Sequence, residues 1–437
     1  MVLLPHLRAL EWQVFSSQSK NDHLPATLLC MGPELTRLEL NAAGQRIPPP
    51  EHVLCASLEM MATCFPRMED FTLLVSDRGV SYGMETSLAL SRLIPSYSSW
   101  ASFDCTSIPL TVDAIKFLST LPTLHRLSMQ LPENADWSPL KQIPLPFAPL
   151  AAVVIAGTMQ AYIDFAPAVS LTHLEDLTFW VLDDEVASHL LNPFFAAIRH
   201  QCSPARLHRL FVEADYDRSA DGWASQAVVR PDNIRTLLDF VAMKHCDLAL
   251  LCHAELDAQF LQDLAKAWPQ LVELSLLCED YCIHDSLPPL SALSYFAIHC
   301  RDLDNLNVVV DAASEELEIR DLSEFGGKAS TSELSTLVMG ASPIGDPAVV
   351  AALIVRMFPS VVEVLCSSNF PMNADNGQQF EDRWSLVRDT YLPMLEVVRR
   401  DERRRIEQEA EDEDTMDVEA GDEGEGDGKE ESSEMSM

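Results

Sequence analysis

One stretch of the chain, residues 256–278, constrains the fold more than any other. It reads LDAQFLQDLAKAWPQLVELSLLC, in which apolar residues at helical spacing are followed by Trp268 and Pro269, where the helix stops. Three leucines then follow in the pattern L-x-x-L-x-L, and the last two point to the same side of a short strand: Leu271, Leu274 and Leu276. Such a unit cannot bury its own apolar face, so it needs copies of itself on both sides.

Variants of this unit recur along the chain. Their first apolar positions are separated by 24 to 33 residues, or by about twice that where a unit is degenerate: 7, 35, 68, 124, 150, 174, 207, 271, 334 and 361. The pattern predicts an α/β fold, a leucine-rich-repeat-like solenoid of about ten to twelve irregular helix–strand units with a parallel concave sheet. A doubly wound α/β domain would also alternate helix and strand, but it would not repeat the residue types at the turn.

Some units are weaker than the others. SLALSRLI at residues 87–94 and WASFDC at residues 100–105 are interpreted as a helix and a strand with degraded spacing. Between residues 290 and 339, the segments LSALSYFAIHC, EELEIRDL and SELSTLVM are interpreted as three further strand units.

The composition divides the chain into three parts. We expect residues 1–378 to form the solenoid and residues 379–406 to form an amphipathic capping segment, in which Pro393 marks a kink or break. Residues 407–437 carry 15 acidic residues against Lys429 alone and contain no aromatic residue, so we expect this tail to be disordered.

Net charge limits the classes of partner. The chain carries a net charge of -37, and the tail accounts for -14 of it, so the predicted solenoid is acidic too. Long-range repulsion therefore disfavours nucleic acid and anionic lipid as partners. No apolar run is long enough to span a bilayer, no signal peptide is evident, and the 11 cysteines are scattered, so we expect a location in the cytoplasm or nucleus. We also expect the chain to be a monomer.

Motifs for catalysis are missing from the sequence. It contains no G-x-S-x-G, P-loop, G-x-G-x-x-G or H-E-x-x-H pattern, so we expect no enzyme activity, no catalytic residue and no cofactor. The one cluster with ligand chemistry comprises Cys278, Cys282 and His284, with Cys252-His253 and His299-Cys300 in neighbouring units. Its spacing matches no standard zinc site, and we interpret Cys252, Cys278 and Cys300 as small buried residues that end equivalent strands.

The strand pattern also predicts the binding surface. In L-x-x-L-x-L the residues that flank the second leucine point outward on the concave face, where a protein ligand would bind. The candidates are Arg126, Ser128 and Gln130; Asp176, Thr178 and Trp180; Arg209, Phe211 and Glu213; Glu273 and Ser275. Aromatic residues and arginine dominate interface energetics, which singles out Trp180 and Phe211 beside Arg209; alternatively, one aromatic tucks under a neighbouring loop.

Four phrases of the sequence carry a family resemblance. GPELTRLEL, AKAWPQLVELSL, ASPIGDPAVVAALIVRMFPSV and RWSLVRDTYLPML resemble, in this order, the leucine-rich regions of fungal F-box proteins of mushroom-forming species, over residues 4–396. The resemblance implies a substrate receptor of a cullin-RING ubiquitin ligase, whose repeats hold the substrate. No F-box-like segment precedes the first repeat, so a Skp-type adaptor is expected as a partner only if an F-box is encoded upstream. The alternative is a scaffold that uses the same concave face without a ligase.

Overall fold

The structure is a computed structural model that describes the chain in ranges separated by gaps. The described residues are 4–13, 28, 32–41, 50–74, 82–142, 144–147, 149–183, 186–214, 228–250, 253–276, 287–313, 332–366, 377–401 and 404–405. Within them, thirteen parallel strands form one sheet whose spatial order follows the order of the chain. The fold is therefore an α/β solenoid of the leucine-rich-repeat type, as the sequence predicts, with thirteen strands where ten to twelve units were expected.

The strands of this sheet are short and evenly spaced along the chain. They are β1 (Ala9–Gln13), β2 (Arg37–Asn41), β3 (Asp70–Leu74), β4 (Ser102–Pro109), β5 (Arg126–Gln130), β7 (Ala152–Gly157), β9 (Asp176–Val181), β10 (Arg209–Ala214), β12 (His245–Ala249), β14 (Glu273–Ser275), β15 (Asn305–Asn307), β16 (Thr336–Val338) and β17 (Glu363–Leu365). Two small sheets accompany them, formed by β6 (Leu145–Pro146) with β8 (Val169–Ser170) and by β11 (Val228–Val229) with β13 (His253–Ala254).

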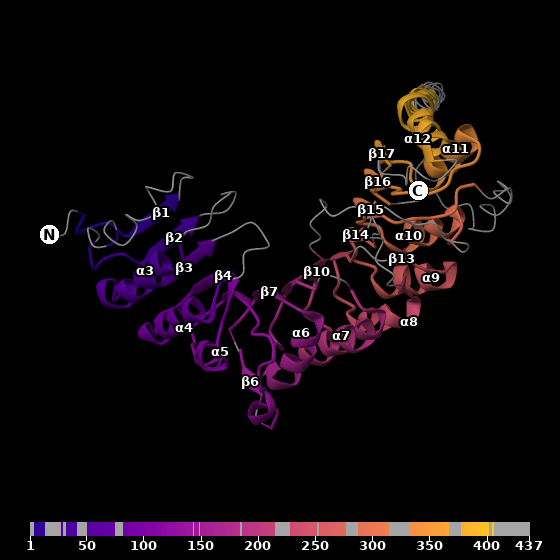
Figure 1. The fold of residues 1–437 in the computed structure, drawn as a ribbon. Coiled ribbons are helices and arrows are strands. Elements are labelled where there is room, and N and C mark those ends of the chain that lie inside the picture. Colours follow the sequence, from indigo (N-terminus) through magenta and orange to yellow (C-terminus); the bar gives the residue numbers. More distant parts are fainter. Residues whose placement is uncertain are drawn as a thin grey trace, which may run out of the picture.

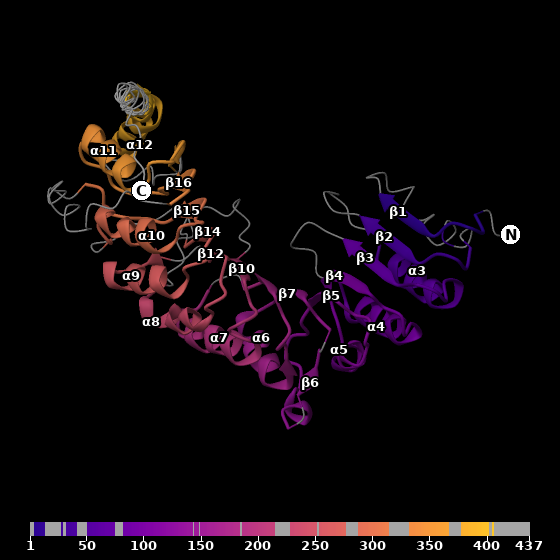
Figure 2. The ribbon, with the colours of Figure 1, turned by 180° about the vertical axis from the view of Figure 1, so that it is seen from behind.

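Helices cover the outer side of the arc, and the sheet lines its inner side (Figures 1 and 2). They are α3 (Glu51–Cys64), α4 (Met84–Leu93), α5 (Val112–Ser119), α6 (Met159–Phe165), α7 (Ser188–Gln201), α8 (Pro231–Ile234), α9 (Ala258–Ala267), α10 (Ser294–His299), α11 (Pro347–Met357) and α12 (Gly377–Leu386). Because a helix is wider than the spacing of two strands, placing helices on one side only curves the sheet towards its uncovered face.

The aromatic-proline turn ends three helices in the same way. Phe65, Trp268 and Phe358 follow α3, α9 and α11, with φ near -120° and ψ between 65° and 83°. Each precedes a proline, which disfavours the helical conformation in the residue before it. All three side chains are buried, so the residue that stops the helix also anchors the turn in the core.

A continuous ladder of backbone hydrogen bonds joins the turns that precede the strands. In each turn one N–H donates to the carbonyl oxygen of the equivalent residue one repeat earlier, at 2.8 to 3.2 Å. The ladder runs through Arg8, Thr36, Glu69, Ala101, His125, Ala151, Glu175, His208, Lys244, Val272, Asp304, Ser335 and Val362. Consecutive repeats are thus held in register at the edge of the sheet where the strands begin.

The residue before each ladder position is the first apolar residue of its unit. Of the predicted positions, Leu7 is partly buried and the others lie in the core. The three long gaps in the predicted series are filled by Trp100, Met243 and Leu303, which are equally buried and precede β4, β12 and β15. The degenerate units are therefore real repeats whose first apolar residue is a tryptophan, a methionine or a leucine among polar neighbours.

One predicted strand is wrong. LSALSYFAIHC forms a 3₁₀ turn at Leu290–Leu293 and then α10, and the strand of that repeat is β15, further along the chain. SELSTLVM does contain a strand, β16. EELEIRDL lies outside the described residues.

The chain after β17 packs back against the last repeats. α12 continues through a π-helical turn, Val387–Tyr391, into a helical segment at 392–401 that passes through Pro393 without ending. Because Pro393 has no N–H to donate, the wider turn before it accommodates the missing hydrogen bond. Trp384 and Val387 are buried against the core. The boundaries expected for a capping segment stay a prediction, and residues 407–437 lie outside the described part of the chain.

Candidate protein-binding face

Strand alternation and parallel register place the outward residues in rows. In β2, β3, β5, β9 and β10, alternate strand residues are buried, and those between them face the uncovered side of the sheet. Because neighbouring strands pair residue by residue, the first, third and fifth strand positions form three rows across the arc. The sheet lines the concave side of the arc (Figures 1 and 2), so these rows form the concave face.

The register brings the predicted residues of β9 and β10 together. Asp176 lies opposite Arg209, Thr178 lies opposite Phe211, and Trp180 lies opposite Glu213. Trp180 and Phe211 are therefore diagonal neighbours, a relationship within reach of large side chains. Both are half-buried, as expected for side chains that lie on a sheet surface.

The other predicted residues are separated from this pair by β7 and β12, whose outward residues the predicted surface did not include. β7 lies between β5 and β9, so that Arg126, Ser128 and Gln130 pair with Ala152, Val154 and Ala156. β12 lies between β10 and β14, so that Glu273 and Ser275 pair with His245 and Asp247. The concave face thus includes these five residues of β7 and β12, which sequence reasoning missed.

The middle of the concave face is apolar. Val154 lies in the same row as Thr178 and Phe211, while Trp180 lies in the next row beside Ala156. We call Val154, Thr178, Trp180 and Phe211 the central patch. Each of its side chains is half-buried, so the patch presents two aromatic rings and a valine on the concave side of the sheet.

Ser275 differs from the other predicted residues. Its exposure is only 9%, and its hydroxyl accepts a hydrogen bond from the side-chain amide of Asn307 at 3.3 Å. Asn307 occupies the same row on the next strand, β15. Ser275 therefore offers little surface to a partner, and Asn307 is the polar residue that the row presents next to it.

Charge on the first row is partly compensated. The guanidinium of Arg209 lies 3.5 Å from the carboxylate of Asp176. Burial raises the pKa of Asp176, and the nearby Arg209, His208 and His245 oppose this rise. The imidazole of His245 lies 3.4 Å from the carboxylate of Glu273. This part of the face therefore holds its charges in pairs across neighbouring strands.

The N-terminal end of the concave face is more acidic. Glu11 and Glu39 are neighbours in the middle row, and Asp104 lies two strands further along it. Burial raises the pKa of Asp104, a hydrogen bond from Ser128 lowers it, and the charge of Glu39 raises it further. The concave face thus changes from acidic at its N-terminal end to apolar at its centre.

The cysteine cluster receives no support as a metal site from the described residues. Cys252, Cys278, Cys282 and His284 lie outside them, and no group of three or more potential ligands converges within them. Cys300 is buried, as expected, but it follows α10 rather than ending a strand. Its thiol donates to the carbonyl oxygens of Ala265 and Trp268 at 3.6 and 3.5 Å, so it closes the turn against the preceding repeat.

Among the helices that the structure describes, none combines the length and apolarity needed to cross a membrane. No family model matches the sequence, and no curated protein sequence matches it. The fold is similar to that of an internalin from Listeria monocytogenes, with 15% identity and a TM-score of 0.37, over 76% of this chain and 80% of that one. It is also similar to a chain in the complex of Rad7 and Elc1 from yeast, with 13% identity and a TM-score of 0.38, over 87% of this chain and 83% of that one.

Proposed function

We propose that this chain is a protein-binding solenoid whose concave face, centred on the central patch, holds a protein partner. One observation carries the proposal: Trp180 and Phe211 are diagonal neighbours on adjacent strands, and Val154 lies beside them. All three lie on the side of the sheet opposite to the described helices (Figure 1). Large aromatic residues contribute most to the affinity of protein interfaces, especially when other residues around them exclude water. The central patch supplies both.

The finer proposal is that the partner is the substrate of a ubiquitin ligase. The resemblance of the repeats to those of fungal F-box proteins supports this reading, and it includes a Skp-type adaptor if an F-box exists upstream. A scaffold or regulator without a ligase is the second candidate. In either case we propose an intracellular protein, cytoplasmic or nuclear, that acts as a monomer without enzymatic activity and binds neither nucleic acid nor membrane.

Co-purification distinguishes the two candidates. A substrate receptor should retain a Skp-type adaptor and a cullin at stoichiometric amounts when it is isolated from its own cells, together with any segment encoded upstream. A scaffold should retain its partner but neither ligase component.

Site-specific photo-crosslinking tests the binding face itself. A crosslinking amino acid is placed at Thr178 in the central patch and, as a control, at His200, which is exposed on α7 on the helical side. We expect one dominant partner from position 178, and we expect Trp180→Ala to abolish that product. A partner captured from position 200 and not from position 178 would show that the helical side, and not the concave face, is the interface.

A further inference from the structure

The edge of the sheet where β5 to β12 begin carries an unusual charge. The whole chain has 30 lysines and arginines against 67 acidic residues. At this edge, the five successive turns and the first strand residue after each of them hold four cations, four of the chain's 12 histidines and two carboxylates. The basic residues, which we call the turn strip, are His125, Arg126, His173, Arg206, His208, Arg209, Lys244 and His245.

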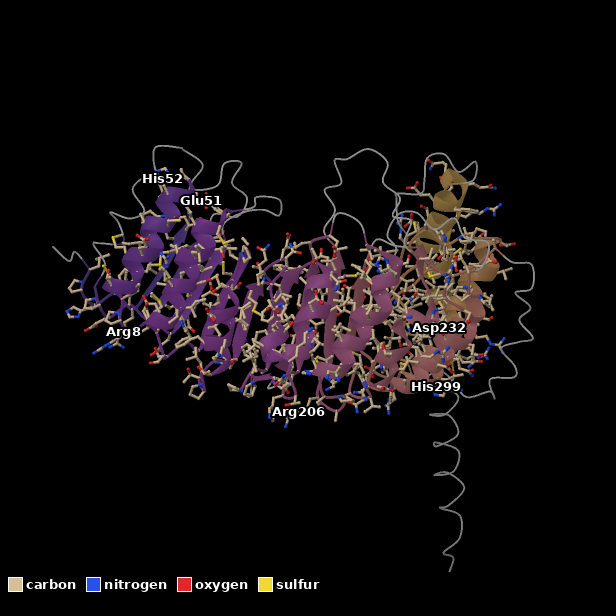
Figure 3. The ribbon with its side chains drawn as sticks, turned by 60° about the horizontal axis from the view of Figure 1, so that its bottom comes forward. Arg8, Glu51, His52, Arg206, Asp232 and His299 are labelled. Atoms are coloured by element: carbon tan, nitrogen blue, oxygen red, sulfur yellow. The ribbon has the colours of Figure 1, made fainter. Side chains whose placement is uncertain are left out.

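The backbone ladder fixes the spacing of the turn strip. His125, His208 and Lys244 are themselves ladder residues, so their Cα positions repeat with the spacing of the strands. From β5 through β7, β9 and β10 to β12 there are four such steps, which together span roughly 19 Å. An extended peptide of about six residues covers this length. Arg206 lies at the same edge of the molecule as Arg8 and His299, opposite Glu51 and His52 (Figure 3).

Three cations of the turn strip are available to a ligand. Arg126, Arg206 and Lys244 are exposed, and the structure shows no ion pair between them and any described residue. Only Arg209 is engaged, by Asp176. In a chain with more than twice as many acidic as basic side chains, three exposed cations spread along one edge, none paired with a described carboxylate, indicate that an acidic segment from elsewhere is accommodated here.

Two histidines of the turn strip share one arrangement. The Nδ1 atom of His125 lies 3.3 Å from the carbonyl oxygen of Thr123, and that of His208 lies 3.3 Å from the carbonyl oxygen of Arg206. A carbonyl oxygen can only accept, so Nδ1 carries the hydrogen in both rings. Nε2 is then the nitrogen that takes up a second proton, and in the imidazolium form it becomes a charged donor for a ligand.

We propose that the turn strip docks an acidic segment of the protein partner, lying across the turns before β5 to β12. This inference rests on the proposed function and names the chemistry of the partner beside the central patch. The acidic side chains pair with Arg126, Arg206 and Lys244, while apolar residues of the same partner reach Trp180 and Phe211 one to two rows into the sheet. The strong negative charge elsewhere on the chain confines an acidic segment to this strip.

Protonation of the histidines strengthens the strip. With neutral histidines, its four cations face Glu175, Asp176 and the adjoining Glu273, a local net charge of +1; four protonated histidines raise it to +5. Further charged groups on the packed elements are Asp247 in the middle row, Arg199 and Asp239 as an ion pair on the helical side, Arg67 and Glu69 in the turn before β3 with Asp70 at the start of that strand, and Arg301, Asp302 and Asp304 in the turn before β15.

The probe for this proposal is a fluorescein-labelled oligoglutamate of about ten residues, titrated with the full chain and followed by anisotropy. We expect binding that tightens by at least tenfold between pH about 7.5 and pH about 5.5 and that weakens with salt. Arg206→Glu combined with Lys244→Glu should weaken it by roughly tenfold or more. The matched control, Arg92→Glu with Lys141→Glu, reverses the same number of exposed charges away from the strip and should leave the affinity within about twofold.

A histidine series tests the pH dependence separately. His125→Gln, His208→Gln and His245→Gln together should remove most of it, whereas His52→Gln, His189→Gln and His200→Gln should preserve it. Equal pH dependence in the two triple variants would overturn the role of the strip. Circular dichroism at both pH values confirms that the variants remain folded.

A crosslinking arm identifies the occupant. A photo-crosslinker replaces Ala205, which is exposed and adjoins Arg206. Crosslinks to an acidic segment of the partner captured from Thr178 support the proposal, and crosslinks to the chain's own residues 407–437 overturn it. Suppose that position 178 captures a partner, but position 205 does not crosslink to it and the charge reversals in the strip do not weaken oligoglutamate binding. The inference then fails while the proposed function stands. If oligoglutamate binds but position 178 captures nothing, the proposed function fails instead.

Discussion

Trp384 donates a hydrogen bond from its indole Nε1 to the main-chain carbonyl oxygen of Ser342, at 2.8 Å, across 42 residues of sequence. Ser342 is itself buried, and its hydroxyl accepts from the backbone N–H of Val310 at 2.9 Å. The next residue before Trp384, Arg383, donates to the carbonyl oxygen of Ile344 at 2.8 Å. The helix after the last strand is thus attached to the segment between β16 and α11 by two hydrogen bonds that also satisfy buried backbone carbonyl groups.

We predict that Trp384→Ala lowers the free energy of unfolding by roughly 3 to 5 kcal/mol. The indole is only 1% exposed, so its removal leaves a cavity and an unpaired carbonyl oxygen on Ser342. Urea unfolding followed by circular dichroism measures the change. Leu386→Ala, at an exposed position of the same helix, is the control and should change stability by less than about 0.5 kcal/mol. Equal effects of the two variants would show that the helix is not attached through Trp384.

Leu274→Ala and Trp180→Ala should differ sharply in stability. Leu274 is fully buried between β12 and β15, and its truncation should cost roughly 2 to 5 kcal/mol. Trp180 lies half-buried on the concave face, and its truncation should cost about 1 kcal/mol or less while abolishing capture of the partner from position 178. A melting temperature that falls as far in Trp180→Ala as in Leu274→Ala would place the indole in the core.

The buried hydrogen bond between Tyr162 and Gln201 should contribute to the stability of the fold. The Tyr162 hydroxyl donates to the side-chain oxygen of Gln201 at 2.5 Å, and the Gln201 amide donates to the carbonyl oxygen of Ala166 at 3.1 Å. Both side chains are buried, so Tyr162→Phe leaves an acceptor unsatisfied and should cost roughly 1 to 3 kcal/mol. The double variant Tyr162→Phe with Gln201→Leu should recover part of this loss. An additive double variant would mean that the pair does not act as a unit.

Alkaline pH should destabilise the fold through its buried thiols. Burial raises the pKa of Cys105, Cys202 and Cys300 to about 12, and it also raises the pKa of Cys246. Because the folded pKa lies above the unfolded value, the stabilisation is complete below about pH 8.5 and is lost as the pH rises towards 12. We expect stability to fall by roughly 1.4 kcal/mol per pH unit for each thiol in this window. In Cys246→Ala, the free energy of unfolding measured by urea titration should fall less steeply with pH. An unchanged slope would show that the Cys246 thiol does not contribute to this pH dependence.

The repeat pattern could be predicted because the first apolar residue of each unit has one physical requirement, which is burial beneath its turn. Leucine satisfies it in most units, and these leucines were identified except for Leu303, together with Met68 and Val361. Trp100 and Met243 satisfy the same requirement with other shapes, so a search for leucine passes over them. LSALSYFAIHC was assigned wrongly because apolar residues three apart fit both the strand motif and one face of a helix. Only the neighbouring β15 decides between the two.

The candidate face was predicted in part for a related reason. Alternation along one strand gives the outward positions, and those of β9 and β10 were assigned correctly to a common surface. The outward residues of β7 were left out of the predicted surface because Ala152, Val154 and Ala156 look like core residues in a sequence whose outward positions are usually polar. Which strands are neighbours, and hence that Trp180 faces Glu213 and not Arg209, depends on register, which no single strand contains.

The ladder from Arg8 to Val362 has a mechanical consequence. The ladder bonds each turn to the turns before and after it, so a pulling force applied to the two ends of the chain loads the interfaces one after another. Under tension the protein should peel from an end in steps of about 30 residues, each releasing roughly 100 Å of chain, and should rewind in the same order when the tension is relaxed. A partner lying across the turns before β5 to β12 would clamp five of these steps together, so that the middle of the arc would resist extension more strongly when occupied.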